Sequence, residues 1–138
     1  MRATLILGSN LGRREAALER ARALLCEVLG PCSAASPAVE TPAVGFDGPA
    51  FLNQIVCYEC SLEPLELLHL CKRIEVAMGR DLSLPLHDEA GRRIYHSRII
   101  DIDILLLGDL TLHSPELTIP HPQLDSRPHV RPLLDSVV

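Results

Sequence analysis

Two aspartates in one apolar run have the residue types and spacing that could do chemistry. Asp101 and Asp103 stand two positions apart within 99–107. Alternate side chains of a β-strand share a face, so both carboxylates would point the same way, about 6.6 Å apart along the chain. Carboxylates at this spacing can hold a pair of magnesium ions, which sit roughly 3.5–4 Å apart in two-metal sites. Arg98, just upstream, adds a donor suited to phosphate.

The same aspartates also allow a plainer interpretation, in which they lie on the solvated outer face of a strand. The opposite face would be filled by Ile100, Ile102, Ile104 and Leu106. Charges in the middle of an apolar run favour the metal site. On these residues alone both interpretations remain open.

Two helices are predicted from apolar residues that recur at helical spacing. The first spans 13–29, and Gly30-Pro31 ends it, as a glycine followed by proline typically does. The second opens at 61–64 and stops at Gly79. Their buried faces are predicted to comprise Leu18, Ala21, Leu25 and Val28 in the first helix, and Leu67, Cys71, Ile74 and Met78 in the second.

Strands are predicted for the apolar runs that surround these helices. They cover 3–7, 32–41 with a break at Pro37, 51–60, 99–107 and 110–112. The order β-α-β-β-α-β predicts an α+β fold, a ferredoxin-like sandwich with an antiparallel sheet and both helices on one face. Extra C-terminal elements would follow, including a short helix from Pro132. We expect one domain, 1–138, and the fold alone does not decide the chemistry.

Composition narrows the class of partner. The chain has 138 residues, is 47% hydrophobic and carries a net charge of −5, so it lacks the basic excess of a nucleic-acid binder. No apolar run approaches the roughly 20 residues of a membrane helix, and no signal peptide is visible. The five cysteines form no second CxxC besides Cys57 and Cys60, so we expect reduced thiols in a cytoplasmic protein. We also expect a monomer.

Several short motifs, taken together and in order, add a specific resemblance. The stretch from Arg98 through Asp101 and Asp103 resembles the signature of the 6-hydroxymethyl-7,8-dihydropterin pyrophosphokinase family. Nearly the whole chain takes part in this resemblance, and the joint match is more specific than any single motif. The matching segments are Gly8-Ser9-Asn10, Thr41-Pro42, Phe51-Leu52-Asn53, Arg73-Ile74-Glu75, Gly79-Arg80, Leu117 to Pro122, and Arg127.

The resemblance implies transfer of the β,γ-diphosphoryl unit of ATP to the hydroxymethyl group of a reduced pterin, releasing AMP, in folate synthesis. It implies that Asp101 and Asp103 bind two magnesium ions and that Arg80 and Arg98 neutralise the triphosphate. The implied ATP-binding residues are Lys72, Glu75, Ile104, Thr118, His121 and Arg127. The implied pterin-binding residues are Thr41, Pro42, Val44, Phe51, Asn53 and His129.

The chain departs from the family pattern at a few positions. His129 stands where the family usually places a phenylalanine, and Pro122 where an aromatic residue is common. The polar stretch 80–97 is predicted to be a loop, and loops of this length usually act as lids or binding loops. Its candidates for ATP contact are Arg92, Arg93 and Tyr95, among which the sequence does not choose.

Two rival functions stay open from the sequence. One is a ligand-sensing module of the same fold that retains the aspartates and arginines without turnover. The other is a magnesium-dependent phosphotransferase with a different acceptor. No Walker-type GxxxxGK[ST] and no Ser-His-Asp set is evident, which favours a kinase that is not of the P-loop class.

Overall fold

The computed structural model describes residues 1–43, 48–79, 89–90 and 99–137. Strands and helices follow one another much as the hydrophobic pattern predicts. The elements in chain order are β1 (Arg2–Ser9), α1 (Arg14–Leu29), β2 (Cys32–Ala35), β3 (Val39–Thr41), β4 (Phe51–Glu59), α2 (Pro64–Ala77), β5 (Asp101–Leu107), β6 (Leu112–His113), β7 (Thr118–Ile119), α3 (Gln123–Ser126) and α4 (Val130–Asp135).

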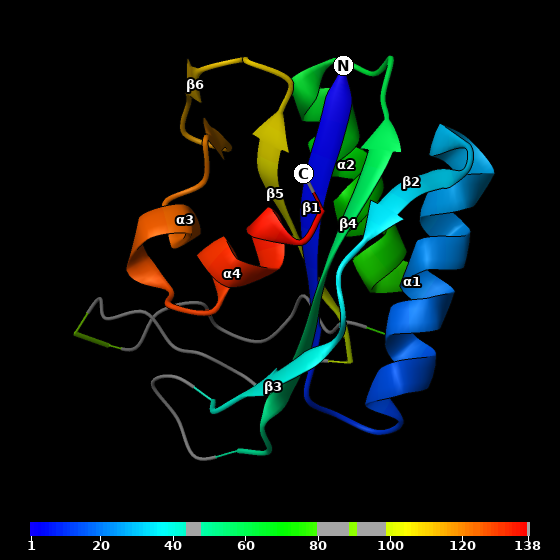
Figure 1. Ribbon diagram of the computed structural model, residues 1–138, viewed down its shortest axis with the longest axis vertical. Helices are drawn as coiled ribbons and strands as arrows, with labels where there is room; N and C mark the ends of the chain where they lie inside the picture. Colours follow the sequence, from blue (N-terminus) through cyan, green and yellow to red (C-terminus); the bar gives the residue numbers. More distant parts are fainter. Residues whose placement is uncertain (44–47, 80–88, 91–98, 138) are drawn as a thin grey trace.

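The main sheet confirms the predicted ferredoxin-like plan. Its strand order is β2-β4-β1-β5, with β3 also paired to β4, and the pairs of β1, β2 and β3 are antiparallel. The segment 32–41 is two short strands because Pro37 cannot donate to a ladder. Figure 1 shows β1 at the centre of the sheet, with α1 and α2 packed on one side and the short α4 crossing the other.

The face under α1 and α2 carries the larger hydrophobic core, in which Leu5 and Leu7 of β1 meet Leu25 of α1 and Leu67 of α2. The predicted helix faces are right except at Val28, which is 55% exposed, and at Met78, which is only partly buried just after α2. Ala17 takes the place of Val28 on the buried face, because that face follows Ala17, Leu18, Ala21 and Leu25 one turn after another.

The opposite face is covered by the C-terminal elements. Leu124 of α3 and Val130, Leu133 and Leu134 of α4 pack on Ile6, Ile55, Cys57 and Leu105 of the sheet. These elements reach only part of the face, because β1 and β4 also extend to Gly8 and Asn53 beyond this second core. Gly8 and Asn53 therefore lie at the end of the sheet that α3 and α4 do not reach.

A β-bulge in β5 changes one predicted side-chain direction. Leu5 pairs with Ile104 and Thr4 pairs with Leu106, so Leu105 is an extra residue opposite β1. The prediction that Leu106 shares a face with Ile104 is therefore wrong. Leu106 packs against the second core, whereas Leu107 turns into the first.

The predicted strand 110–112 is also displaced, because β6 is Leu112–His113 and pairs with β7. Leu110 N–H instead donates to Leu107 O at 3.1 Å and closes the turn at Gly108, whose φ is +54°. Because of this turn, β6 begins two residues later than predicted.

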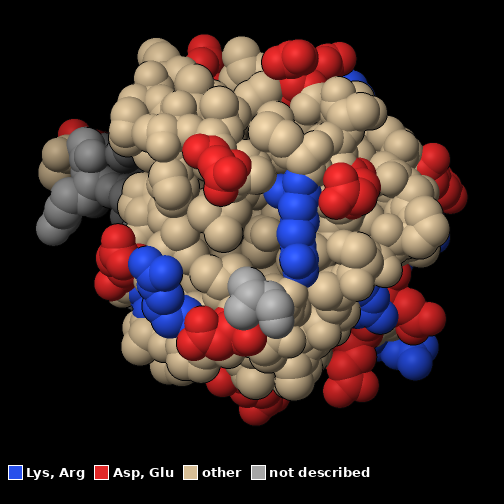
Figure 2. All heavy atoms as spheres, turned by 45° about the horizontal axis from the view of Figure 1, so that its top comes forward, with Lys and Arg blue, Asp and Glu red and all other residues tan. Residues whose placement is uncertain are grey.

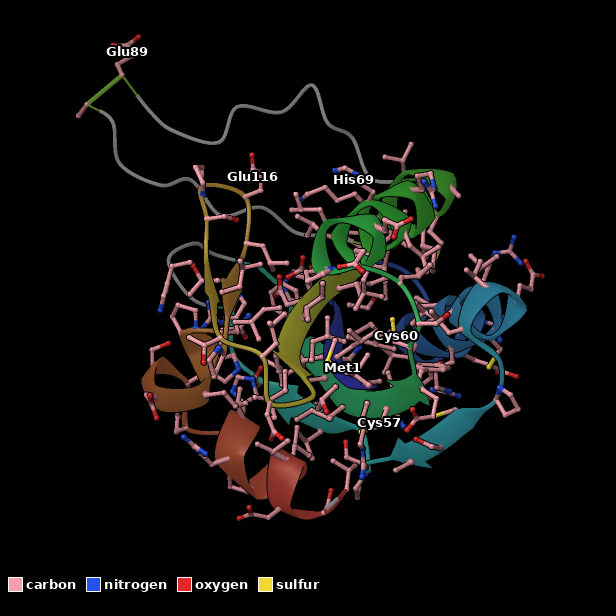
Figure 3. All side chains as sticks on the ribbon, turned by 90° about the horizontal axis from the view of Figure 1, so that it is seen from above. Met1, Cys57, Cys60, His69, Glu89 and Glu116 are labelled. Atoms are coloured by element: carbon pink, nitrogen blue, oxygen red, sulfur yellow. The ribbon has the colours of Figure 1, made fainter. Side chains whose placement is uncertain are left out.

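The five cysteines are free thiols. Cys57 belongs to the core under α4, whereas Cys60 belongs to the core under α1 and α2, and both are labelled with Met1 in Figure 3. The two residues of the CxxC thus lie on opposite faces of the sheet. Burial, together with the carboxylates of Glu75 and Asp103, raises the pKa of Cys71 to about 12. These thiols act as small hydrophobic side chains, as the sequence predicts.

Ser9 at the end of β1 is fully buried, and its hydroxyl has no hydrogen-bond partner among the described residues. A buried hydroxyl without a partner costs free energy that an alanine does not. We expect Ser9→Ala to raise the free energy of unfolding by about 0.5–1 kcal/mol. Urea denaturation would measure the change, and a loss of more than about 1 kcal/mol would show that the hydroxyl does have a partner.

Candidate active site

Three polar or small positions form a row across the sheet. Gly8 on the central strand pairs with Asn53 of β4 on one side and with Asp101 of β5 on the other. Residues in register on neighbouring strands share a face and lie about 4.8 Å apart. Three segments that are far apart in the sequence thus meet at the end of the sheet that α3 and α4 leave uncovered.

Gly8 leaves room between its two neighbours. A Cβ at this position would lie 3.2 Å from Asn53 Oδ1 and 3.4 Å from the Cδ1 atom of Phe51. Such contacts are tighter than ordinary van der Waals packing, so only glycine fits without moving these side chains. The glycine therefore lets an aromatic ring and an amide lie over the central strand.

Asn53 is the end of the row on β4, and Phe51 lies beside it on the same face of that strand. The Asn53 amide nitrogen donates to Thr41 Oγ1 at 2.7 Å, and Asn53 is only 7% exposed. β3 places Thr41 directly opposite Phe51 in the ladder. This corner therefore offers a fixed amide beside an aromatic ring, which suits a flat heterocycle with paired donors and acceptors.

A cavity of about 350 Å³ lies on the other side of the row, between α2, β5 and the segment 114–122. Both aspartates line it, as do five of the six predicted ATP-binding residues. Its lining includes Lys72, Glu75, Asp101, Asp103, Ile104, Glu116, Thr118 and His121. In Figure 3, Glu116 on the connection between β6 and β7 lies across from α2, which carries His69.

The charge of this cavity decides what it can hold. Among the described lining residues the carboxylates are Glu75, Asp101, Asp103 and Glu116, and the cation is Lys72. A triphosphate placed here would meet mostly negative charge, so it needs added cations to bind. Figure 2 shows acidic side chains scattered over one face of the molecule, with basic ones in a few separate places.

The outer edge of β5 borders the cavity. Glu75 is 2% exposed, and its Oε2 atom accepts the Ile102 N–H at 2.8 Å. The His121 N–H donates to Leu105 O at 3.0 Å on the same edge. Because bonds alternate along an antiparallel strand, the backbone groups of Ile104 also point to this edge. Any contact of Ile104 with a nucleotide would therefore use its backbone, since its side chain is buried.

Replacing Glu75 tests how much its hydrogen bond with the Ile102 N–H stabilises the outer edge of β5. We expect Glu75→Ala to lower the free energy of unfolding by about 2–3 kcal/mol, because a buried backbone N–H loses its acceptor. Glu75→Gln keeps an acceptor oxygen of the same reach and should cost less than about 1 kcal/mol. Equal losses in the two variants, measured by urea denaturation, would contradict the assignment.

His121 is held as a neutral ring. Its Nδ1 atom accepts the Gln123 N–H at 3.0 Å, so the proton of the neutral ring is on Nε2. Burial lowers the pKa of His121, and Arg127 lowers it too, whereas Asp101 acts in the opposite direction. The neutral ring therefore offers one N–H donor near pH 7.

His129 and Arg127 are neighbours beside α4. Burial lowers the pKa of His129, and so does Arg127. Neither residue is among the cavity-lining residues. Pro42 is exposed just after β3. Three further predicted site residues, Val44, Arg80 and Arg98, lie outside the described residues, as does nearly all of the predicted loop 80–97.

Gln123 is a site residue that the sequence analysis missed. Its side-chain nitrogen donates to Asp103 Oδ2 at 2.8 Å. Only the position two residues after His121 could have drawn attention to it, and a glutamine two residues after a histidine is no motif. Tertiary structure alone brings it to the carboxylate.

Comparison with known proteins decides the family. The model of the family described as 7,8-dihydro-6-hydroxymethylpterin-pyrophosphokinase matches residues 4–137. The chain belongs to this family. A 2-amino-4-hydroxy-6-hydroxymethyldihydropteridine pyrophosphokinase of Porphyromonas gingivalis is 40% identical over 134 residues, which cover 95% of this chain and 87% of that protein.

Other relatives agree with this membership. A protein of the same name from Bacillus subtilis is 35% identical over 127 residues, covering 91% of this chain and 71% of that protein. A folate synthesis bifunctional protein of Chlamydia trachomatis is 35% identical over 141 residues, covering 96% of this chain and 29% of that protein. The predicted family and enzyme class are therefore confirmed, and the chain is a pyrophosphokinase of folate biosynthesis. No helix in the described part of the chain has the length and apolarity that a bilayer crossing requires.

Proposed function

We propose that the chain transfers the β,γ-diphosphoryl unit of ATP to 6-hydroxymethyl-7,8-dihydropterin. The hydroxymethyl oxygen attacks the β-phosphorus, the bond to the α-phosphate oxygen breaks, AMP leaves and the hydroxyl proton passes to solvent. The row of Asn53, Gly8 and Asp101 carries this proposal. It sets a corner suited to a pterin beside an acidic cavity large enough for part of a nucleotide.

The donor set of the cavity fits magnesium. Mg²⁺ usually binds one or two carboxylates and takes its other ligands from water and substrate phosphates. Asp101 and Asp103 supply two carboxylates on one face, and no cluster of three or more ligating side chains occurs within the described ranges. We propose that these two residues hold two ions. Bound magnesium would neutralise the phosphates and align them for in-line attack.

The protein groups around the ions would bind and orient the substrates. Phe51 stacks on one face of the pterin, and Asn53 reads its edge. Thr41, Pro42, Val44 and His129 complete the pterin pocket in this proposal. Backbone groups of Ile104 and the Nε2–H of His121 contact the nucleotide. We also propose nucleotide contacts for Lys72, Glu75, Thr118 and Arg127, and charge neutralisation by Arg80 and Arg98.

AMP formation with and without the reduced pterin tests the proposal. We expect AMP and a diphosphorylated pterin in equal amounts when ATP, magnesium and the pterin are all present. A module that only senses ligand would bind both compounds and release no AMP. A phosphotransferase with another acceptor would show no dependence on the pterin. A cytoplasmic setting and a monomeric state remain predictions.

A further inference from the structure

Gln123 makes three contacts with residues to which the proposed function gives a role. Its side-chain nitrogen donates to Asp103 Oδ2 at 2.8 Å, and its backbone N–H donates to His121 Nδ1 at 3.0 Å. Its backbone oxygen accepts the Arg127 N–H at 3.1 Å. One residue at the start of α3 thus touches a proposed metal ligand and two proposed nucleotide contacts.

We infer that Gln123 is a positioning residue that fixes the carboxylate of Asp103 for metal binding. The inference rests on the proposed function, because it concerns how the metal ligand is held. An ionised carboxylate only accepts hydrogen bonds, so the amide must present its nitrogen to Asp103. That bond uses one of the roughly four lone-pair sites of the carboxylate.

The backbone contacts explain why the amide itself is well placed. The bond to His121 and the bond from Arg127 hold Gln123 through main-chain atoms, so changing its side chain leaves both in place. The side chain is half-buried and spans from α3 to β5. Groups that orient a metal-binding carboxylate from outside typically change metal affinity by roughly 10–100-fold when they are removed.

Gln123→Met tests the inference, because methionine has a similar length and no donor. Manganese binding is measured by its paramagnetic resonance signal in the presence of a non-hydrolysable ATP analogue, and pterin binding is measured by fluorescence. We expect about tenfold weaker manganese binding and pterin affinity within about twofold of the unaltered protein. Ser126→Ala, an exposed change in the same short helix, is the matched control and should alter neither.

Three results would overturn the inference. Manganese affinity that is unchanged in Gln123→Met would show that the amide does not position Asp103. Equal losses of manganese and pterin affinity would indicate a purely structural role. Failure of the unaltered protein to bind manganese with the nucleotide would instead sink the metal site of the proposed function, and the inference with it.

A measurement on the unaltered protein covers the case in which Gln123→Met does not fold. The side-chain amide protons of Gln123 give separate nitrogen-edited NMR signals. Magnesium bound to Asp103 draws electron density from the oxygen that these protons contact, so we expect both signals to shift on addition of magnesium with the ATP analogue. Signals that stay in place while Asp101 and Asp103 backbone signals move would contradict the inference.

Discussion

Asp101→Asn and Asp103→Asn should each lower kcat by at least about a thousandfold, which equals about 4 kcal/mol of lost transition-state stabilisation. Asparagine keeps the size of the side chain and removes its charge. Only one of the two proposed metal ligands in the acidic cavity would then remain to hold the cations that a triphosphate needs. Steady-state rates at saturating magnesium and nucleotide measure the effect.

The fold should survive both changes, because each aspartate is only half-buried at the outer edge of the sheet. Glu116→Gln serves as a matched control, since it removes one carboxylate from the same cavity without touching the row across the sheet. We expect less than about a tenfold loss of kcat for the control. Activity close to that of the unaltered protein in either aspartate variant would rule out the metal assignment.

Asn53→Ala should weaken pterin binding about 100-fold, or about 2.7 kcal/mol, with little change in nucleotide affinity. In the unaltered protein the Asn53 amide is buried, so its hydrogen bonds to the pterin would form in a place that water scarcely reaches. Its loss removes hydrogen bonds and leaves the polar edge of the pterin without partners. Fluorescence titration with the pterin, alongside titration with the ATP analogue, measures both affinities.

Thr41→Val tests how much the positioning of Asn53, as distinct from its direct contact with the pterin, contributes to pterin binding. Valine keeps the shape of threonine and removes the hydroxyl that accepts the Asn53 amide at 2.7 Å. We expect a smaller loss of pterin affinity, about fivefold, because Asn53 remains present but less fixed. If Thr41→Val costs as much as Asn53→Ala, the amide serves the fold and does not read the pterin.

Hydrophobic periodicity predicted most of the helices and strands, because the spacing of the residues that each element buries is a property of its own stretch of sequence. Leu18, Ala21 and Leu25 repeat at helical spacing and are buried as expected. Prediction failed where pairing decides the outcome. Leu106 lies on the other face because a bulge at Leu105 adds one residue opposite β1. No local sequence pattern predicts this extra residue.

The sequence by itself also determined the family and the two aspartates on one strand face, since alternation along β5 is a local property. Tertiary structure decided which distant segments stand beside them. Strand pairing set Gly8 between Asn53 and Asp101, and the return of α3 over the sheet brought Gln123 to Asp103. Contacts of this kind depend on sheet register and on where a short helix docks. Both are fixed by the sum of long-range packing, which no single stretch of sequence contains.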